Sequence, residues 1–262
     1  MIRYDLAAEP VWLAVISAGR PHAVAEYEDR VGRATWYVPP WEKQRYLDAG
    51  AFNVHPVDGL CAARNAALRA AFIRELPCVQ MSDDIKGFIR AEEREDSTPL
   101  THRYQRVEER LMTVVQDLQT TARETGARLV GVSATDSLIF YDHTKPTSLR
   151  NFILGDFMYI TPSEPTFDER MELKEDYDFT AQHMVHYGIV ARRNMWILKA
   201  QHRTNAGGAV ARRTLALEEQ TIAYLQNKWG TAIMASNPRK PGEILFRWPR
   251  KTSNVPSRVP SI

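Results

Sequence analysis

The chain has 262 residues, of which 44% are hydrophobic and 25% are charged, and its formal net charge is +2. This length and apolar content can bury the core of one large α/β domain, and the small net charge excludes a polycation that coats nucleic acid indiscriminately. There is no run of about 18 apolar residues and no signal-peptide pattern at the start. The two cysteines, Cys61 and Cys78, lack metal-binding spacing. We therefore expect a soluble, cytoplasmic protein with no membrane partner.

The first predicted strand is the near-continuous apolar run Val11–Ser17, which is typical of a strand covered on both faces. It leads into a loop that contains Ser17, Gly19 and Arg20, at the place where the first strand of an α/β sheet commonly meets a ligand. A plain strand-to-helix turn explains the same residues equally well. Further strands are predicted at 34–38 and 53–57, with a helix at 42–49 between them.

An acidic pair follows the next helix and strand. The helix covers 59–76 and carries Arg64 and Asn65 near its start, and the strand that begins at Cys78 ends in Asp83 and Asp84. Adjacent carboxylates repel unless a positive charge lies beside them, and Mg²⁺ or Mn²⁺ takes such oxygen ligands together with substrate phosphates. The alternative is an acidic turn that caps the next segment. Because strands and helices alternate here, we expect a mostly parallel sheet flanked by helices.

The middle of the chain is simpler. Apolar residues recur at helical spacing from Tyr104 onward, and Gly126 ends this predicted helix. Strands are predicted at 128–133 and 151–160, and the second of these carries Gly155 and Asp156.

A second acidic stretch opens the next predicted helix, which runs to Tyr187 and stops at Gly188. It contains Glu175, Asp176 and Asp178. Carboxylates at a helix start favour the helix dipole, which is a sufficient structural explanation. The functional alternative is that one of them accepts a proton from an attacking hydroxyl group.

A histidine and a glycine pair follow the strand that begins at Ile197. His202 suits a metal ligand, and glycine lets the backbone approach phosphates closely. A lone histidine is more often structural. The residues assigned to this loop are His202, Asn205, Gly207 and Gly208.

The C-terminal residues 238–262 hold six basic residues and one acidic residue. We expect residues 1–237 to form the domain and residues 238–262 to form a basic, proline-rich tail. Among its basic and aromatic residues, those of interest are Arg239, Lys240, Arg247, Trp248, Arg250 and Lys251. A disordered terminus is the alternative that composition favours.

The order of these parts resembles a glycosyltransferase of the GT-A type, which has a Rossmann-like fold. The resemblance covers about residues 11–208. It implies a metal held by Asp84, Asp83 and His202. It also implies that Asp176 is the catalytic base of a reaction that inverts the anomeric carbon, and that Glu175 and Asp178 assist it. The resemblance further implies a nucleotide-sugar donor, with a UDP-sugar as the first candidate. Its nucleotide would contact Ser17, Gly19, Arg20, Arg64, Asn65, Asp83, Asn205, Gly207 and Gly208. The chain departs from the pattern in having Asp-Asp-Ile in place of Asp-x-Asp, and Gln182-His183 where an arginine often follows.

A narrower resemblance joins four segments: Arg64-Asn65, the stretch 80–85, the stretch 173–179 and the stretch 205–208. These segments look like the glycosyltransferases associated with TET/J-binding-protein oxygenases, which include bacteriophage members. The resemblance implies transfer of a sugar, with Mn²⁺ or Mg²⁺, to 5-hydroxymethylcytosine or 5-hydroxymethyluracil in DNA. It also implies that the basic tail binds DNA, with its cations on phosphates and Trp248 stacked on a displaced base. For a phage protein the location would be the host cytoplasm. Two other classes stay open: a metal-dependent nucleotidyltransferase, and a non-catalytic DNA-binding module that keeps the fold.

Overall fold

The computed structural model describes residues 9–94, 104–133, 141–200 and 214–249. The strands are β1 (Trp12–Ile16), β2 (Thr35–Val38), β3 (Asn53–Pro56), β4 (Cys78–Ser82), β5 (Ile85–Glu93), β6 (Tyr104–Glu109), β7 (Leu129–Ser133), β8 (Thr147–Ser148), β9 (Phe157–Ile160), β10 (Ala191–Ala200), β11 (Met234–Ser236) and β12 (Ile244–Phe246). The α-helices are α1 (Val24–Val31), α2 (Lys43–Asp48), α3 (Leu60–Phe72), α4 (Leu111–Thr125), α5 (Glu175–Tyr187) and α6 (Leu215–Trp229). Two short 3-10 helices, η1 (Pro21–Ala23) and η2 (Pro40–Glu42), precede α1 and α2.

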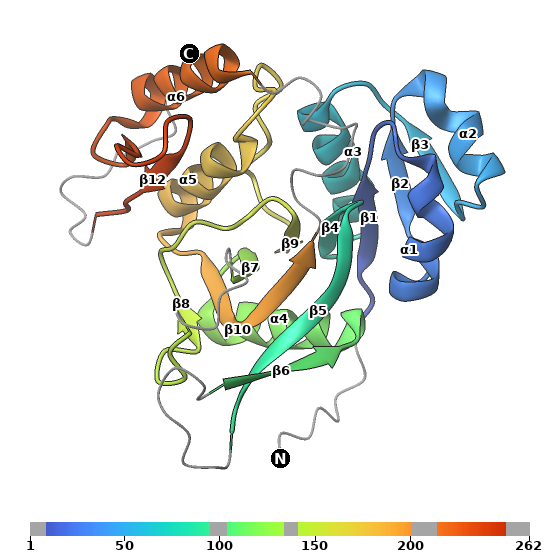
Figure 1. The fold of residues 1–262 in the computed structure, drawn as a ribbon, viewed down its shortest axis with the longest axis horizontal. Coiled ribbons are helices and arrows are strands. Elements are labelled where there is room, and N and C mark those ends of the chain that lie inside the picture. Colours follow the sequence, from blue (N-terminus) through green and yellow to red (C-terminus); the bar gives the residue numbers. More distant parts are fainter. Residues whose placement is uncertain (1–8, 95–103, 134–140, 201–213, 250–262) are drawn as a thin grey trace.

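In the described part of the chain, ten strands form one sheet in the order β3-β2-β1-β4-β9-β7-β10-β5-β6, with β8 paired to β10 (Figure 1). The α/β class is as predicted. The prediction of a mostly parallel sheet is wrong. The neighbours β3, β2, β1 and β4 are parallel, and so are β7 and β10, whereas β9, β5, β6 and β8 run antiparallel to the strands they pair with.

The connections explain this difference. Parallel neighbours need a long crossover, usually a helix, and the chain provides one up to β4. After β4 the chain turns through Asp83 and Asp84 directly into β5, and α4 leads into β7. The strand β9 then inserts between β4 and β7 in the opposite direction.

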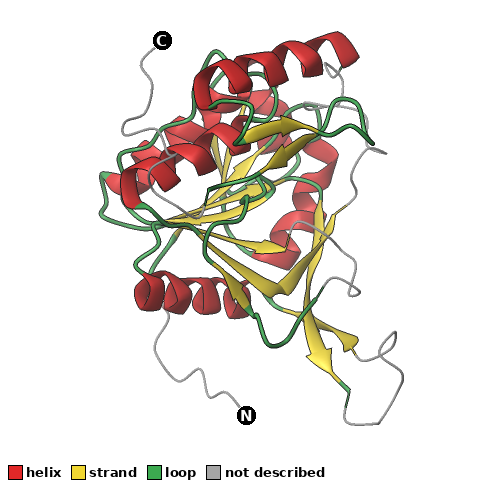
Figure 2. Cartoon of the chain, turned by 90° about the vertical axis from the view of Figure 1, so that its left-hand side faces the viewer, coloured by secondary structure: helices red, strands yellow, loops and turns green. Residues whose placement is uncertain are grey.

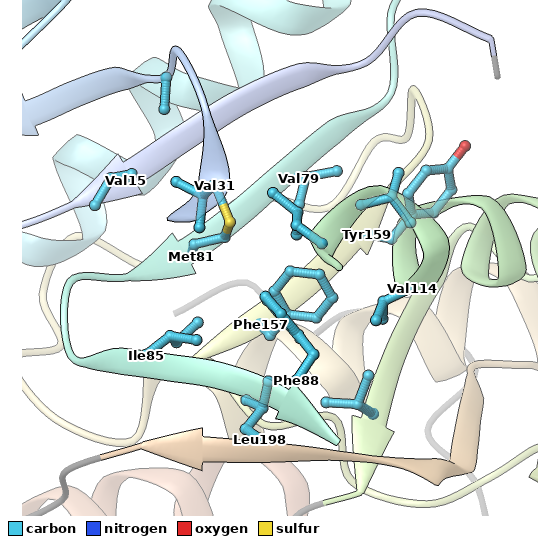
Figure 3. Close-up of a cluster of buried hydrophobic side chains, with 14 of the residues drawn as sticks. Val15, Val31, Val79, Met81, Ile85, Phe88, Val114, Phe157, Tyr159 and Leu198 are labelled. Atoms are coloured by element: carbon cyan, nitrogen blue, oxygen red, sulfur yellow. The ribbon is translucent and has the colours of Figure 1, made fainter. Parts of the chain in front are cut away.

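Helices cover both faces of the sheet (Figure 2). Side chains alternate along β4, so that Val79 and Met81 pack with α1, α2 and α4, while Cys78 packs with α3, α5 and α6. Figure 3 shows the first of these clusters, in which Val79 and Met81 lie close to Phe157 of β9. The result is a three-layer α/β/α arrangement.

Two helix predictions had different outcomes. The helix predicted to end at Gly188 is confirmed as α5, and Gly188 has a left-handed φ of +70°, which a residue with a Cβ adopts at a cost. The helix predicted from Tyr104 begins only at Leu111. Residues Tyr104–Glu109 instead form β6, because pairing with β5 satisfies their backbone groups.

The segment predicted as a strand at 151–160 is a strand only from Phe157. Near the C-terminus, β11 and β12 form an antiparallel hairpin, and Ile244 is buried against the second core cluster. The predicted domain boundary at 237/238 lies in the turn of this hairpin, so residues 238–249 of the predicted tail belong to the fold. Among the helices that the structure describes, none is long and apolar enough to cross a membrane.

Candidate active site

The order of the strands reverses at β1. From β1 the chain proceeds to β2 and β3 on one side of it, and then returns to add β4 on the other side. Such a reversal of strand order is a topological switch point, where open α/β sheets bind their ligands. The loop after β1 and the acidic turn after β4 both lie at this point.

These two loops are joined by a buried cluster of polar groups. Asp83 accepts hydrogen bonds from Ser17 Oγ and from Arg20 Nη1, each at 2.5 Å. The hydroxyl of Tyr46 is 2.6 Å from Ser17 Oγ and accepts the Arg20 amide at 3.0 Å. Burial raises the pKa of Asp83, although its bonds to Ser17 and Arg20 act in the opposite direction. The glycine of the loop, Gly19, donates its amide to Glu42 Oε2 at 2.7 Å.

Asp84 is held differently from Asp83. The Oδ1 atom of Asp84 accepts a hydrogen bond from Ser82 Oγ at 2.8 Å, and Asp84 as a whole is 9% exposed. Within the described ranges, no three His, Cys, Asp or Glu side chains gather as ligands for a metal. A magnesium-type ion needs only one or two carboxylates when substrate phosphates and water complete its shell. Asp84 fits that requirement, whereas Asp83 is occupied by Arg20.

Arg64 brings the start of α5 to the end of β4. Its guanidinium donates to Glu175 Oε1 at 3.0 Å, to Gln80 Oε1 at 3.2 Å and to the Gly155 carbonyl at 3.1 Å. Gln80 in turn donates to the Arg64 carbonyl at 2.8 Å. One buried side chain therefore fixes α3, β4, α5 and the segment before β9 to one another.

Asp176 lies at the same junction. Its Oδ2 accepts the Gly155 amide at 2.9 Å, and the carbonyl of the next residue, Asp156, accepts the amide of Ser82 at 2.8 Å. Gly155 and Asp156 thus connect Asp176 to Ser82, the residue that precedes the acidic turn. Burial, followed by the negative charge of Glu175, raises the pKa of Asp176 to about 7. A carboxylate with such a pKa is suited to accept a proton near neutral pH.

The backbone is strained where α5 begins. Lys174 has a φ of +58°, in the left-handed region that residues with a Cβ rarely adopt, and its carbonyl accepts the Tyr177 amide at 3.1 Å. Strain of this kind persists only where the surroundings hold it, and it is frequent at functional sites.

Two of the predicted site residues point elsewhere. Asp178 is fully buried between α5 and α6, where it bonds Lys228 Nζ at 2.9 Å and Trp229 Nε1 at 2.7 Å. Asn65 binds the backbone of Phe167, accepting its amide at 2.8 Å and donating to its carbonyl at 2.9 Å. These contacts give both side chains a structural role.

The other predicted residues fall into two groups. Arg239, Lys240 and Arg247 are exposed around the C-terminal hairpin, and Trp248 is half-buried on it. The remainder lie outside the described residues: His202, Asn205, Gly207, Gly208, Arg250 and Lys251.

Sequence reasoning missed three members of the site. Gln80 looks like a core position of a strand, and Gly155 and Asp156 were placed inside a longer strand. The sequence signal for the last two is a glycine followed by an acid just before an apolar run. Neither the scan against protein-family models nor the search of curated proteins found a match to this chain.

Proposed function

We propose that this chain is a metal-dependent glycosyltransferase that moves a sugar from a nucleotide-sugar, a UDP-sugar in first place, to the hydroxymethyl group of a modified pyrimidine in DNA. One observation carries the proposal. The candidate base Asp176 is tied through Gly155 and Asp156 to the end of β4, where the acidic pair Asp83-Asp84 meets the loop after β1. A proton acceptor and a carboxylate suited to hold a metal–diphosphate unit, Asp84, are therefore both linked to the end of the same strand.

The donor would bind at the switch point. Asp84 would hold Mg²⁺ or Mn²⁺, with His202 as a further candidate ligand, and the ion would neutralise charge on the diphosphate. If Arg20 leaves Asp83, its guanidinium can contact the same diphosphate, and the Asp83 oxygen that it now binds, Oδ1, would become available to the ion. In this proposal Arg64 positions Glu175 and does not contact the nucleotide, because its guanidinium is buried in three internal hydrogen bonds.

The acceptor step uses Asp176. The hydroxymethyl oxygen forms a bond to the anomeric carbon while the bond from that carbon to the diphosphate breaks. The hydroxyl proton passes to Asp176, and the nucleoside diphosphate leaves. Attack on the face opposite the leaving group inverts the anomeric carbon. The raised pKa of Asp176 matches this role, since a base with a pKa near the working pH transfers protons efficiently.

A thermal-shift experiment tests the donor half of the proposal. Nucleotide-sugars are added with and without Mn²⁺, and a ligand that binds the native state raises the melting temperature. We expect a Mn²⁺-dependent shift with a UDP-sugar that is lost in Asp84→Asn and kept in Asp176→Asn. If no nucleotide-sugar shifts the wild type, or if Asp84→Asn retains the full shift, the proposal is wrong. Release of pyrophosphate in place of nucleoside diphosphate would identify a nucleotidyltransferase.

A further inference from the structure

Four aromatic rings form a strip beside Asp176. Phe152 and Tyr177 are stacked, with ring centroids 4.0 Å apart and planes inclined by 14°. Phe246 and Trp248 are also near-parallel, at 6.1 Å and 20°. The two pairs meet through Phe246, whose centroid lies 6.3 Å from that of Phe152 and 6.5 Å from that of Tyr177. We call these four residues the aromatic strip.

Two of the four rings come from the segments that surround the candidate base. Tyr177 follows Asp176 and donates its amide to Asp176 Oδ1 at 3.0 Å, while Phe152 lies on the segment whose Gly155 amide binds Asp176 Oδ2. The hairpin of β11 and β12 brings the other two rings, and the Tyr177 hydroxyl donates to the Ile244 carbonyl at 3.3 Å. In Figure 1, β12 lies next to α5 at one end of the molecule.

Burial and charge distinguish the strip from ordinary core. All four rings are only partly buried, whereas the aromatic residues of the core, such as Phe179, are enclosed. The hairpin that carries Phe246 and Trp248 also presents three exposed cations, Arg239, Lys240 and Arg247. Its acid Glu243 is 3.5 Å from Lys240 and offsets part of that charge.

We infer that the aromatic strip is the surface on which unpaired bases of single-stranded DNA stack, so that the acceptor base is presented to Asp176 from a displaced strand. This inference rests on the proposed function and specifies its acceptor side. Aromatic rings that remain partly exposed next to exposed cations are the combination that binds single strands, because the rings stack on base faces and the cations contact phosphates. A base inside a duplex offers no free face to the strip and would first have to leave the stack.

The test compares DNA oligonucleotides of about 12 nucleotides that differ only in their bases. A labelled oligothymidine and an oligonucleotide of the same length with abasic sites are titrated with the full chain, and fluorescence anisotropy reports binding. Removing bases should weaken wild-type binding by about 5- to 150-fold, and Trp248→Ala should weaken oligothymidine binding by a similar factor. The variant should lose little affinity for the abasic strand, so the two changes are not additive.

Two further variants complete the design. Arg247→Gln should weaken both oligonucleotides alike and reduce the slope of log affinity against log salt by roughly 0.7. Trp41→Ala, which removes a 65% exposed ring on η2, should change neither. Equal wild-type affinity for oligothymidine and the abasic strand overturns the inference without requiring any variant, and so does tighter binding of duplex than of single-stranded DNA.

The outcome is separable from that of the proposed function. Base-dependent binding with no nucleotide-sugar shift would keep the strip as a single-strand surface and reject the transferase. A Mn²⁺-dependent nucleotide-sugar shift without base-dependent binding would keep the donor site and reject the strip as the acceptor surface.

Discussion

The Gly155 amide donates a hydrogen bond to Asp176 Oδ2 across 2.9 Å. Glycine leaves room for this contact, because a Cβ at position 155 would come within 2.9 Å of Arg64 Nη2 and 3.2 Å of Asp176 Oδ2. The close approach satisfies one oxygen of a carboxylate that has Glu175 and Asp156 as electrostatic neighbours. It also makes the Gly155 amide a reporter of the charge on Asp176.

We predict that the chemical shift of the Gly155 amide proton follows the ionisation of Asp176, with an apparent pKa near 7. The hydrogen bond strengthens when Asp176 loses its proton, so the amide resonance should move downfield as the pH rises. Two-dimensional NMR of a uniformly ¹⁵N-labelled sample between pH 5 and 9 measures this shift. In Asp176→Asn the Gly155 titration should vanish. A Gly155 resonance that shows no midpoint between pH 5 and 9 would remove the physical basis for the assigned base.

The same pKa shift predicts an effect on stability. The folded-state pKa of Asp176 lies above the unfolded value of 3.8, so its favourable contribution is present below pH 3.8 and is lost as the pH rises through 7. Asp176→Asn should therefore be more stable than wild type at pH 8, by about 1–3 kcal/mol, with a smaller difference at pH 5. Urea unfolding at the two pH values measures it, and a less stable variant at pH 8 would contradict it.

Replacing Asp178 should lower the stability of the fold, whereas replacing Asp176 should raise it at pH 8. Replacing Asp178 with Asn leaves Lys228 with Asp168 as its remaining carboxylate, 3.2 Å away in a buried setting. We expect Asp178→Asn to lower the free energy of unfolding by about 3 kcal/mol, because a buried ion pair loses one partner. At a temperature where the variant is folded, the Mn²⁺-dependent nucleotide-sugar shift should persist.

A second substitution controls for the lost charge. Asp178→Asn combined with Lys228→Met removes both members of the pair, and this double variant should be less destabilised than the sum of the two single variants. Strictly additive losses would mean that the two side chains do not interact.

Local pattern was enough to predict several elements of this fold. The apolar run of β1, the alternation in β4 and the glycine stop of α5 are short-range signals, and each corresponds to an observed element. The placement of Asp83 and Asp84 at the end of β4 followed from the same reasoning. Backbone propensity and side-chain periodicity depend on residues that are close together in the chain, so they can be read from a single sequence.

Long-range partners could not be read in this way. The antiparallel direction of β9 depends on how the chain returns to the sheet after β7. The different surroundings of Asp176 and Asp178 depend on Lys228 and Trp229, which are 50 and 51 residues from Asp178 in sequence. Nothing in the stretch 175–178 reveals those contacts.

Arg64 provides a fourth prediction. Arg64→Met removes hydrogen bonds to Gln80, Gly155 and Glu175, and it leaves the buried Glu175 without its ion-pair partner. The cost should be about 3–5 kcal/mol in urea unfolding. Arg123→Met is the matched control, since the pair of Arg123 with Glu9 is exposed on both sides and is worth about 0.5 kcal/mol. Equal losses in the two variants would show that Arg64 does not hold the junction together.

His183 gives a fifth prediction, in which the pH dependence of stability is opposite in sign to that for Asp176. It is buried on α5, with Nδ1 2.9 Å from the Phe179 carbonyl, and burial lowers its pKa from 6.5 to about 4. The unfolded chain therefore binds a proton at a pH where the folded chain does not, and stability is lost as the pH falls from 6.5 to 4. The loss attributable to His183 should reach about 3 kcal/mol.

The comparison of two histidines on one helix checks this prediction. Carboxylates also titrate in this range, so the quantity to follow is the difference between wild type and His183→Gln. That difference should diminish as the pH falls from 7 to 4, because the neutral amide has no proton to gain. His186→Gln alters an exposed residue of the same helix, which pairs with Glu164 at 3.6 Å, and should leave the pH profile of stability close to that of wild type. If His183→Gln instead keeps a constant offset from wild type across this range, His183 takes up its proton in the folded state as readily as in the unfolded chain.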